Sequence, residues 1–228
     1  MTDHRADNAK AKRQLPVWQE SILLVVTAVV MAVVVKTFLL QAFYIPSESM
    51  EPTLRPDDKI LVQKVSYWFG DVQRGDIVVF DDPGSWLDSS EAPTADTAIQ
   101  RGLEAIGLFP TGGHLIKRVV GVGGDTVQCC DAAGKITVNG TPLSEPYLLD
   151  ETVNRDQPFE QKVPEGFLWV MGDNRGNSAD SRAHLGDPGG GFIDADSVVG
   201  KAWVRVWPLG RAGFLGGTDA FDDVRPPS

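Results

Sequence analysis

The chain has 228 residues, a formal net charge of −10 and a hydrophobic content of 42%. This length and composition are typical of a globular protein with a sizeable core and exclude an intrinsically disordered chain. The acidic balance, without a basic face or a nucleic-acid-binding motif, argues against nucleic acid as a partner.

The first feature along the chain is a long apolar segment. The stretch Ile22–Val35 is interrupted only by Thr27, and the apolar run continues past Lys36 to Ala42. A helix needs about 20 mostly apolar residues to cross a bilayer. We therefore predict a transmembrane anchor helix over residues 21–42 in a single-pass protein of the cell membrane.

The segment before this helix, residues 1–20, is predicted to be a disordered basic tail. Its positive charges are Arg5, Lys10, Lys12 and Arg13. The positive-inside rule places this tail in the cytoplasm and everything after Tyr44 outside. A cleavable secretory signal is the alternative, but the apolar run is longer than its usual hydrophobic region and no small-residue cleavage site follows.

The rest of the chain has the pattern of an all-β domain, predicted over residues 43–215. Short β-branched runs alternate with Gly, Pro and Asp, and Asn139-Gly140 is typical of a tight hairpin turn. Many short strands with few helical patterns indicate a mainly β fold. The clearest strand candidates are 59–65, 76–80, 115–120, 135–139, 167–171 and 197–207.

Two segments depart from this pattern. Residues 83–113 read as an inserted surface segment, with one amphipathic helix predicted over 97–109. Residues 216–228 are rich in Gly, Asp and Pro and are predicted to form a flexible tail.

Two serines directly after the apolar run are the first candidates for chemistry. Ser47 and Ser49 lie between Pro46 and Pro52. Proline restricts its own φ and the conformation of the residue before it, so the segment is stiff. A stiff serine-bearing segment at a membrane surface suits a nucleophile that acts on something held in that membrane.

A serine nucleophile needs a general base, for which the sequence offers histidine or lysine. His114 and His184 lie in Gly-rich loops, and no His/Cys/carboxylate cluster has the spacing of metal ligands, so we expect no metal or cofactor. Strand alternation places Lys117 on one face with Leu115 and Val119. Desolvation there would lower the pKa of the lysine and let it activate a serine hydroxyl.

Four segments in this order resemble the bacterial type I signal peptidases, membrane-bound Ser/Lys proteases that remove signal peptides. They are Pro46–Leu54, Arg74–Phe80, Lys117–Asp125 and Gly172–Arg182, all placed after the apolar segment as in that family. The resemblance covers residues 21–208 apart from the insertion.

The resemblance implies a role for each matching residue. Ser49 corresponds to the nucleophile and Lys117 to the general base, while the Ser49 N–H and the Ser47 hydroxyl correspond to the oxyanion hole. Ser178 corresponds to the residue that hydrogen-bonds the lysine nitrogen and orients it. A neighbouring structural polar network corresponds to Asp173, Asp180 and Arg182.

The resemblance also implies a substrate. The family cuts signal-peptide-bearing pre-proteins after an Ala-x-Ala pattern, with the substrate bound as an added extended strand. Branched apolar walls would admit only small side chains. The positions that match the pocket lining are Ile45, Met50, Leu54, Leu115 and Ile116. The lipid bilayer is the other expected partner, and the sequence leaves the oligomeric state open.

A few residues differ from the common pattern of the family. Gly176 replaces an acidic residue, Leu115 stands where several members have tyrosine, and Glu48 brings a carboxylate close to Ser49. Cys129 and Cys130 are adjacent, which leaves a vicinal disulfide and two free thiols as alternatives.

Two other functions are weighed against the protease. A catalytically silent, membrane-anchored binding or scaffold domain would not need Ser47, Ser49, Lys117 and Ser178 together. A cytosolic Ser/Lys self-cleaving repressor would need a DNA-binding helix pair and no anchor, and this sequence has the reverse pattern.

Overall fold

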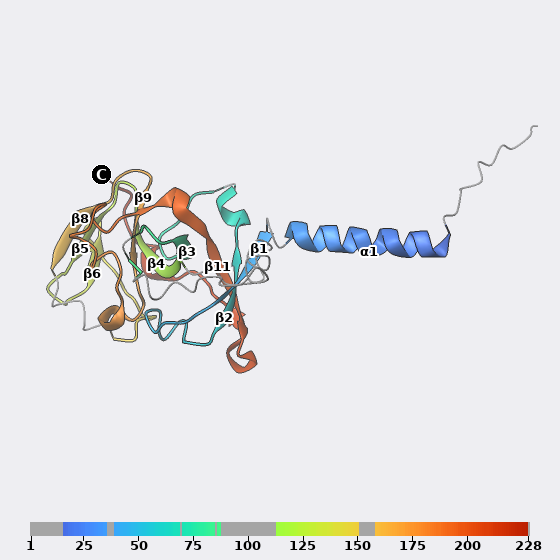
Figure 1. The fold of residues 1–228 in the computed structure, drawn as a ribbon. Helices are drawn as coiled ribbons and strands as arrows, with labels where there is room; N and C mark the ends of the chain where they lie inside the picture. Colours follow the sequence, from blue (N-terminus) through green and yellow to red (C-terminus); the bar gives the residue numbers. More distant parts are fainter. Residues whose placement is uncertain are drawn as a thin grey trace, which may run out of the picture.

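The computed structural model describes residues 16–35, 39–68, 70–84, 86–87, 113–150 and 158–227. It consists of a helix, α1, that projects from a β domain (Figure 1). Helix α1 spans Val17–Val34, and its large apolar side chains are exposed from Val17 to Val33.

The first strand lies where the sequence predicted the end of the anchor. The predicted helix over 21–42 is wrong at its C-terminal end, because Leu40–Tyr44 forms β1 and pairs with β2. Hydrogen bonding to β2 outweighs helix continuation once a partner strand is beside the chain. Among the described residues, no helix combines the length and the apolar character that a membrane crossing requires.

The larger sheet of the described residues has eight strands, in the order β1-β2-β11-β3-β4-β9-β10, with β12 paired to β11. All its pairings are antiparallel. Besides β1, its strands are β2 (Lys59–Gln63), β3 (Ile77–Asp81), β4 (His114–Val122), β9 (Phe167–Met171), β10 (Ile193–Asp194), β11 (Val198–Trp207) and β12 (Gly213–Phe214).

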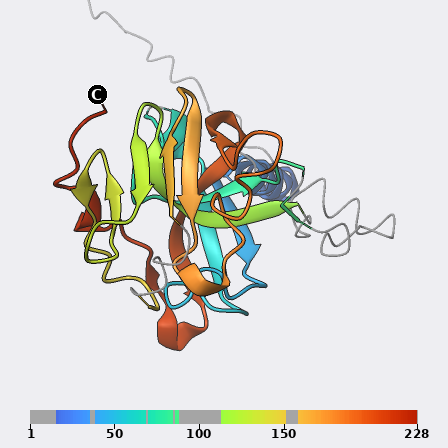
Figure 2. The same ribbon diagram turned by 90° about the vertical axis from the view of Figure 1, so that its left-hand side faces the viewer.

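A smaller antiparallel sheet lies beside β4 and β9 (Figure 2). Its order is β7-β6-β5-β8, made of β5 (Thr126–Cys129), β6 (Ile136–Val138), β7 (Thr141–Pro142) and β8 (Phe159–Lys162). The predicted hairpin turn at Asn139-Gly140 is confirmed: both residues have positive φ, 52° and 74°. Short 3-10 helices occupy Val65–Trp68, Arg175–Asn177, Ala195–Ser197, Leu209–Arg211 and Asp219–Phe221.

Three buried clusters hold these layers together. One cluster fills the space between the two sheets and contains Trp169, Val127 and Phe159. A second lies under the loop between β1 and β2, and a third on β3, β4 and β9 includes Phe80 and Trp86. The loop between β1 and β2 is thus packed onto the larger sheet by its own apolar residues.

The insertion over 83–113 and the tail over 216–228 are the two segments predicted to lie outside the regular β pattern. The predicted helix over 97–109 lies outside the described residues, as does most of the insertion 83–113. The tail predicted to be flexible over 216–228 packs against the domain over its described residues. Phe221 is only 7% exposed and belongs to the cluster between the sheets. This buried side chain anchors an otherwise polar segment to the domain.

Candidate active site

Ser49 lies in the turn-rich loop between β1 and β2. Its side chain is 8% exposed, whereas Ser47 is exposed. Met50 and Leu54 follow it in the sequence and are fully buried. These two apolar side chains anchor the loop and keep Ser49 against the sheet rather than in solvent.

Lys117 comes from the middle of β4 and meets Ser49. Its Nζ donates to Ser49 Oγ at 2.8 Å, and the Ser47 and Ser49 hydroxyl oxygens lie 3.3 Å apart. Lys117 is 3% exposed. Burial lowers the pKa of Lys117 from 10.5 to about 8, against the opposing effect of the Asp180 and Asp173 charges.

The chain leaves the larger sheet beside this pair of side chains. Strand β9 ends at Met171, opposite Arg118 on β4, so the following segment passes next to Lys117. A Cβ at Gly172 would overlap both Ser178 Oγ and the Ser49 carbonyl oxygen. Glycine is therefore needed where this backbone approaches Ser49.

The Ser178 hydroxyl is buried, and among the described residues it makes no hydrogen bond to Lys117; it instead helps to lower the pKa of the neighbouring Asp180. Ser178 lies close to the Ser49 loop by way of Gly172. Asn174 ties the two segments together, since its N–H donates to Ser49 O at 3.0 Å and its Nδ2 to Glu48 O at 3.1 Å.

Asp173 is fully buried and joins three parts of the chain. It accepts two hydrogen bonds from Arg118, at 2.8 and 2.6 Å, and one from Thr53 Oγ1 at 2.5 Å. Arg118 also donates to Gly75 O at 2.9 Å and stacks on the Tyr147 ring. Because Thr53 binds the same carboxylate, the bidentate Arg118–Asp173 pair links the C-terminal part of the Ser49 loop to β4.

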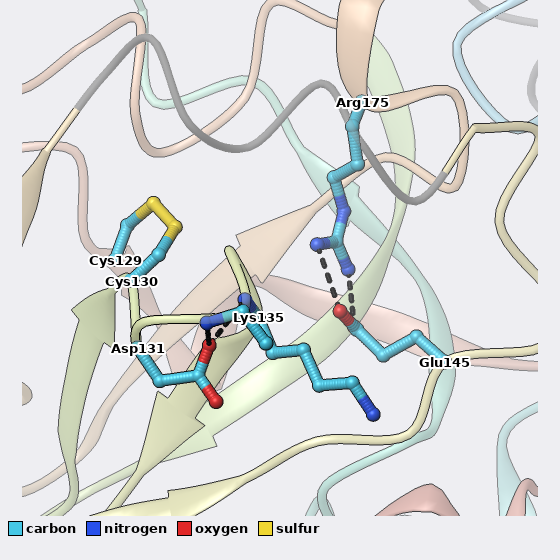
Figure 3. Close-up of a disulfide and its surroundings, with 7 residues drawn as sticks. Cys129, Cys130, Asp131, Lys135, Glu145 and Arg175 are labelled. Carbon is cyan, nitrogen blue, oxygen red and sulfur yellow. Dashed lines mark hydrogen bonds and ion pairs between the residues drawn. A yellow bond between two sulfur atoms is a disulfide. The ribbon is translucent and has the colours of Figure 1, made fainter.

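Asp180 makes the second buried ion pair near Lys117. It accepts from Arg182 Nη2 at 2.8 Å and from the Gly172 N–H at 3.0 Å. Its own burial raises the pKa of Asp180, but the bonds from Arg182 and Gly172 outweigh this and lower it. A third buried pair joins Glu145 to Arg175, which lies between Asp173 and Asp180 in the chain (Figure 3).

The residues predicted to line a substrate pocket divide between two clusters. Ile45, Met50, Leu54 and Ile116 belong to the cluster under the Ser49 loop. Leu115 instead packs against the cluster that contains Phe80, because neighbouring strand residues point to opposite faces.

The two histidines considered as bases have other partners. His114 Nδ1 lies 2.8 Å from Asp81 Oδ1. His184 Nδ1 lies 2.6 Å from Asp187 Oδ2, and its ring stacks on Trp86. The nitrogen that reaches Ser49 Oγ is the one on Lys117.

Cys129 and Cys130 form a vicinal disulfide at the end of β5 (Figure 3). Of the two alternatives that the sequence left open, the structure has the disulfide. Asp131 follows it, and its Oδ1 accepts from the N–H groups of Ala133 and Lys135 at 2.9 and 2.8 Å. The disulfide belongs to the smaller sheet, and Cys129 packs in the cluster between the sheets.

Sequence reasoning missed several residues that hold the site in place. Arg118 and Asn174 lie inside the motif segments. Their position in the sequence next to Lys117 and Asp173 is the feature that could have marked them as site residues. Arg205 at the end of β11 and Arg211 in the following 3-10 helix hydrogen-bond to the Ser49 loop, and no sequence pattern marks them.

Comparisons with known proteins give the family of the chain. The family model described as "Signal peptidase, peptidase S26" matches residues 18–207. The "Probable signal peptidase I" of Mycobacterium leprae is 39% identical over 93% of this chain and 83% of the relative. The "Signal peptidase I" of Mycobacterium tuberculosis is 41% identical over 93% of this chain and 82% of the relative.

One solved structure is also similar in sequence. A signal peptidase I from Enterococcus faecalis V583 is 28% identical, covers 58% of this chain and 97% of its own, and has a TM-score of 0.37.

Proposed function

The chain belongs to the peptidase S26 signal peptidase family, and from this premise we propose that it is a serine endopeptidase that removes N-terminal signal peptides from secreted pre-proteins. The observation that carries the proposal is the 2.8 Å contact between the buried Lys117 Nζ and Ser49 Oγ. A nucleophile in direct contact with a desolvated amine is the arrangement that a Ser/Lys dyad requires.

The proposed reaction begins with proton transfer from Ser49 to neutral Lys117. Ser49 Oγ attacks the scissile carbonyl, and its proton passes to Lys117 Nζ. Lys117 then gives this proton to the leaving amine, which breaks the peptide bond and leaves an acyl-serine. Lys117 next accepts a proton from water, and the resulting hydroxide hydrolyses the ester and regenerates Ser49.

The oxyanion of each tetrahedral intermediate needs donors beside Ser49. We assign this role to the Ser49 N–H and the Ser47 hydroxyl. Ser47 Oγ lies 3.3 Å from Ser49 Oγ, and in the described part of the chain the Ser49 N–H donates to no protein group. The N–H is therefore open to a substrate oxygen, and the Ser47 hydroxyl would turn from Ser49 Oγ to donate to it.

The preference for Ala-x-Ala is assigned to the apolar residues around the Ser49 loop. Ile45, Met50, Leu54 and Ile116 are buried together, so this wall has little freedom to move aside for a large side chain. Leu115 shares a face of β4 with Lys117 but packs against the cluster that contains Phe80, so it is assigned no direct part in this wall.

The polar network is assigned a positioning role. Asp173 ties the segment after β9 to Arg118 on β4, Asp180 accepts from the Gly172 N–H at the start of that segment, and Arg182 holds Asp180 in place. Ser178 is also proposed to orient Lys117; the support is that its buried hydroxyl helps to lower the pKa of Asp180, whose charge acts on Lys117.

We further propose that α1 belongs to a single-pass membrane anchor, with residues 1–20 in the cytoplasm and the β domain outside. The exposed apolar surface of α1 supports this placement, since it would otherwise face water along its whole length. Extraction of membranes at alkaline pH should leave the full chain in the pellet. Release of the full chain into the supernatant would contradict the proposal.

The cleavage proposal is tested with a precursor peptide that carries an Ala-x-Ala site, in detergent or lipid. Wild type should cut after the second Ala, with the site read by mass, and Ser49→Ala and Lys117→Ala should each lose the activity. Cleavage that persists in Lys117→Ala would contradict the dyad. Failure of folded wild type to cut would favour the silent binding domain.

A further inference from the structure

The loop that carries Ser49 has no strand ladder of its own. Between Tyr44, the last residue of β1, and Lys59, the first residue of β2, the chain forms turns and bends. Two backbone hydrogen bonds close the base of the loop, from Ile45 N to Asp58 O at 2.9 Å and from Asp57 N to Ile45 O at 3.0 Å. The height of Ser49 above the sheet therefore depends on groups that reach the loop from other elements.

Two arginines reach the loop just after Ser49, Arg205 from the end of β11 and Arg211 from the 3-10 helix that follows it. Arg205 Nη1 donates to Thr53 O at 2.7 Å, and Arg211 Nη2 donates to Pro52 O at 3.2 Å. These carbonyls belong to the residues that continue the chain directly after the Ser49 turn. Ser49 is thus held from two directions, because its own carbonyl oxygen is bound by the Asn174 N–H.

The two arginines are themselves fixed. Arg205 Nε donates to Arg211 O at 2.5 Å, and Arg211 Nη1 donates to both carboxylate oxygens of Asp58, at 2.9 and 3.0 Å. Asp58 is 1% exposed and lies at the base of the same loop. A guanidinium group presents several donors in one rigid plane, which lets each arginine bind two acceptors at a set spacing.

We propose that Arg205 and Arg211 are positioning residues for the proteolytic reaction, which hold Pro52 and Thr53 so that Ser49 meets Lys117. Neither arginine contacts Ser49 or Lys117, and both act through the main chain of residues 52–53. A displacement of about 1 Å at a reacting atom can lower a rate by ~10²-fold. The inference rests on the proposed Ser49–Lys117 chemistry.

An open cavity makes the proposal testable by chemical rescue. A space of about 730 Å³ borders Arg205, Arg211, Pro52 and Thr53. A small cation in solution therefore has access to the place that a truncated arginine side chain would leave. The probe is methylguanidinium, which supplies the same planar donors.

The experiment compares kcat and KM of the full chain in detergent on an Ala-x-Ala precursor peptide. For Arg205→Ala and Arg211→Ala we expect kcat to fall by ~10- to 100-fold with KM changed by less than about threefold. Arg205→Lys should also lower kcat by about tenfold. A lysine ammonium group cannot donate to Thr53 O and Arg211 O at once with the spacing that the planar guanidinium provides. Methylguanidinium should restore part of the kcat of Arg205→Ala.

The matched control is Arg55→Ala. Arg55 is exposed on the same loop, so its removal makes the same change in charge without removing a hydrogen bond to the loop carbonyls. We expect its kcat within about twofold of wild type, as for most exposed substitutions. Equal kcat values for Arg205→Ala, Arg211→Ala and Arg55→Ala would overturn the proposal.

Two further measurements separate the possible failures. If the alanine variants unfold at the assay temperature, Arg205→Lys decides the question, and wild-type kcat in that variant overturns the proposal. Ser49→Ala and Lys117→Ala run in the same assay. Persistent cleavage in these two would refute the proposed Ser49–Lys117 dyad on which the inference rests, whereas their inactivity with fully active arginine variants would refute only the positioning role.

Discussion

The pH dependence of cleavage is the most direct test of Lys117 as the base. Burial lowers the pKa of Lys117 to about 8, and Lys117 accepts a proton from Ser49 only when it is neutral. We therefore expect kcat/KM to rise about tenfold per pH unit below pH 8 and to level off above it.

The size of the effect follows from the change in pKa. At pH 7 roughly a tenth of the molecules carry a neutral Lys117 if its pKa is about 8, compared with about one in 3,000 at the ordinary value of 10.5. At about 1.36 kcal/mol per pH unit, this difference corresponds to about 3 kcal/mol. Desolvation thus makes the active form about 300-fold more abundant at pH 7.

The assay measures kcat/KM between pH 6 and 10 on an Ala-x-Ala peptide without titratable side chains, because kcat/KM reports the pKa values of the free enzyme. Circular dichroism at each pH provides the control for folding. A rate independent of pH between 6 and 9, or an optimum on the acidic side, would refute the assignment of Lys117.

Four substitutions give further predictions. Ser47→Ala should lower kcat by ~10²–10³-fold and keep more activity than Ser49→Ala, measured on the same peptide. Glu48→Gln should leave the midpoint of the pH profile unchanged, because its exposed carboxylate accepts a hydrogen bond from Asn177 rather than from Lys117. Asp173→Asn should lower the free energy of unfolding in urea by about 3–5 kcal/mol, because it leaves the buried Arg118 without its anion. Lys117→Met should raise that free energy at pH 7 by up to about 3 kcal/mol, a gain that disappears above pH 10.5, since the depressed pKa of Lys117 disfavours folding wherever the lysine is protonated.

The strands that the sequence predicted are those with β-branched runs between turn residues. Strands β2, β3, β4, β6, β9 and β11 match the six predicted segments within a few residues. Strand β1 was missed because Leu40 and Ala42 continue the apolar run of the helix without a break. In such a run the hydrophobic pattern alone does not separate a strand from a helix. The pairing with β2 decides the question, and it is visible only in three dimensions.

The candidate site was predictable to the extent that its residues lie in motif segments. Ser49 and Lys117 came from their motifs, but their contact depends on the point at which β9 ends beside β4. Arg205 and Arg211 carry no such signal. Their hydrogen bonds to Pro52 and Thr53 follow from where β11 ends in space, which a single sequence does not reveal.

The working pH of the base depends on groups that do not touch the reacting atoms. Burial alone would lower the pKa of Lys117 further, and the Asp180 and Asp173 charges oppose this. Each carboxylate is bound to a guanidinium group, Asp180 to Arg182 and Asp173 to Arg118, which partly neutralises its field at the lysine. Unpaired carboxylates at these positions would raise the pKa of Lys117 and leave less of it neutral at pH 7, whereas their complete absence would leave a weaker base. The two buried ion pairs therefore set the strength of the base as well as the shape of the site, and activity changes in variants of either pair have to be read against the pH profile.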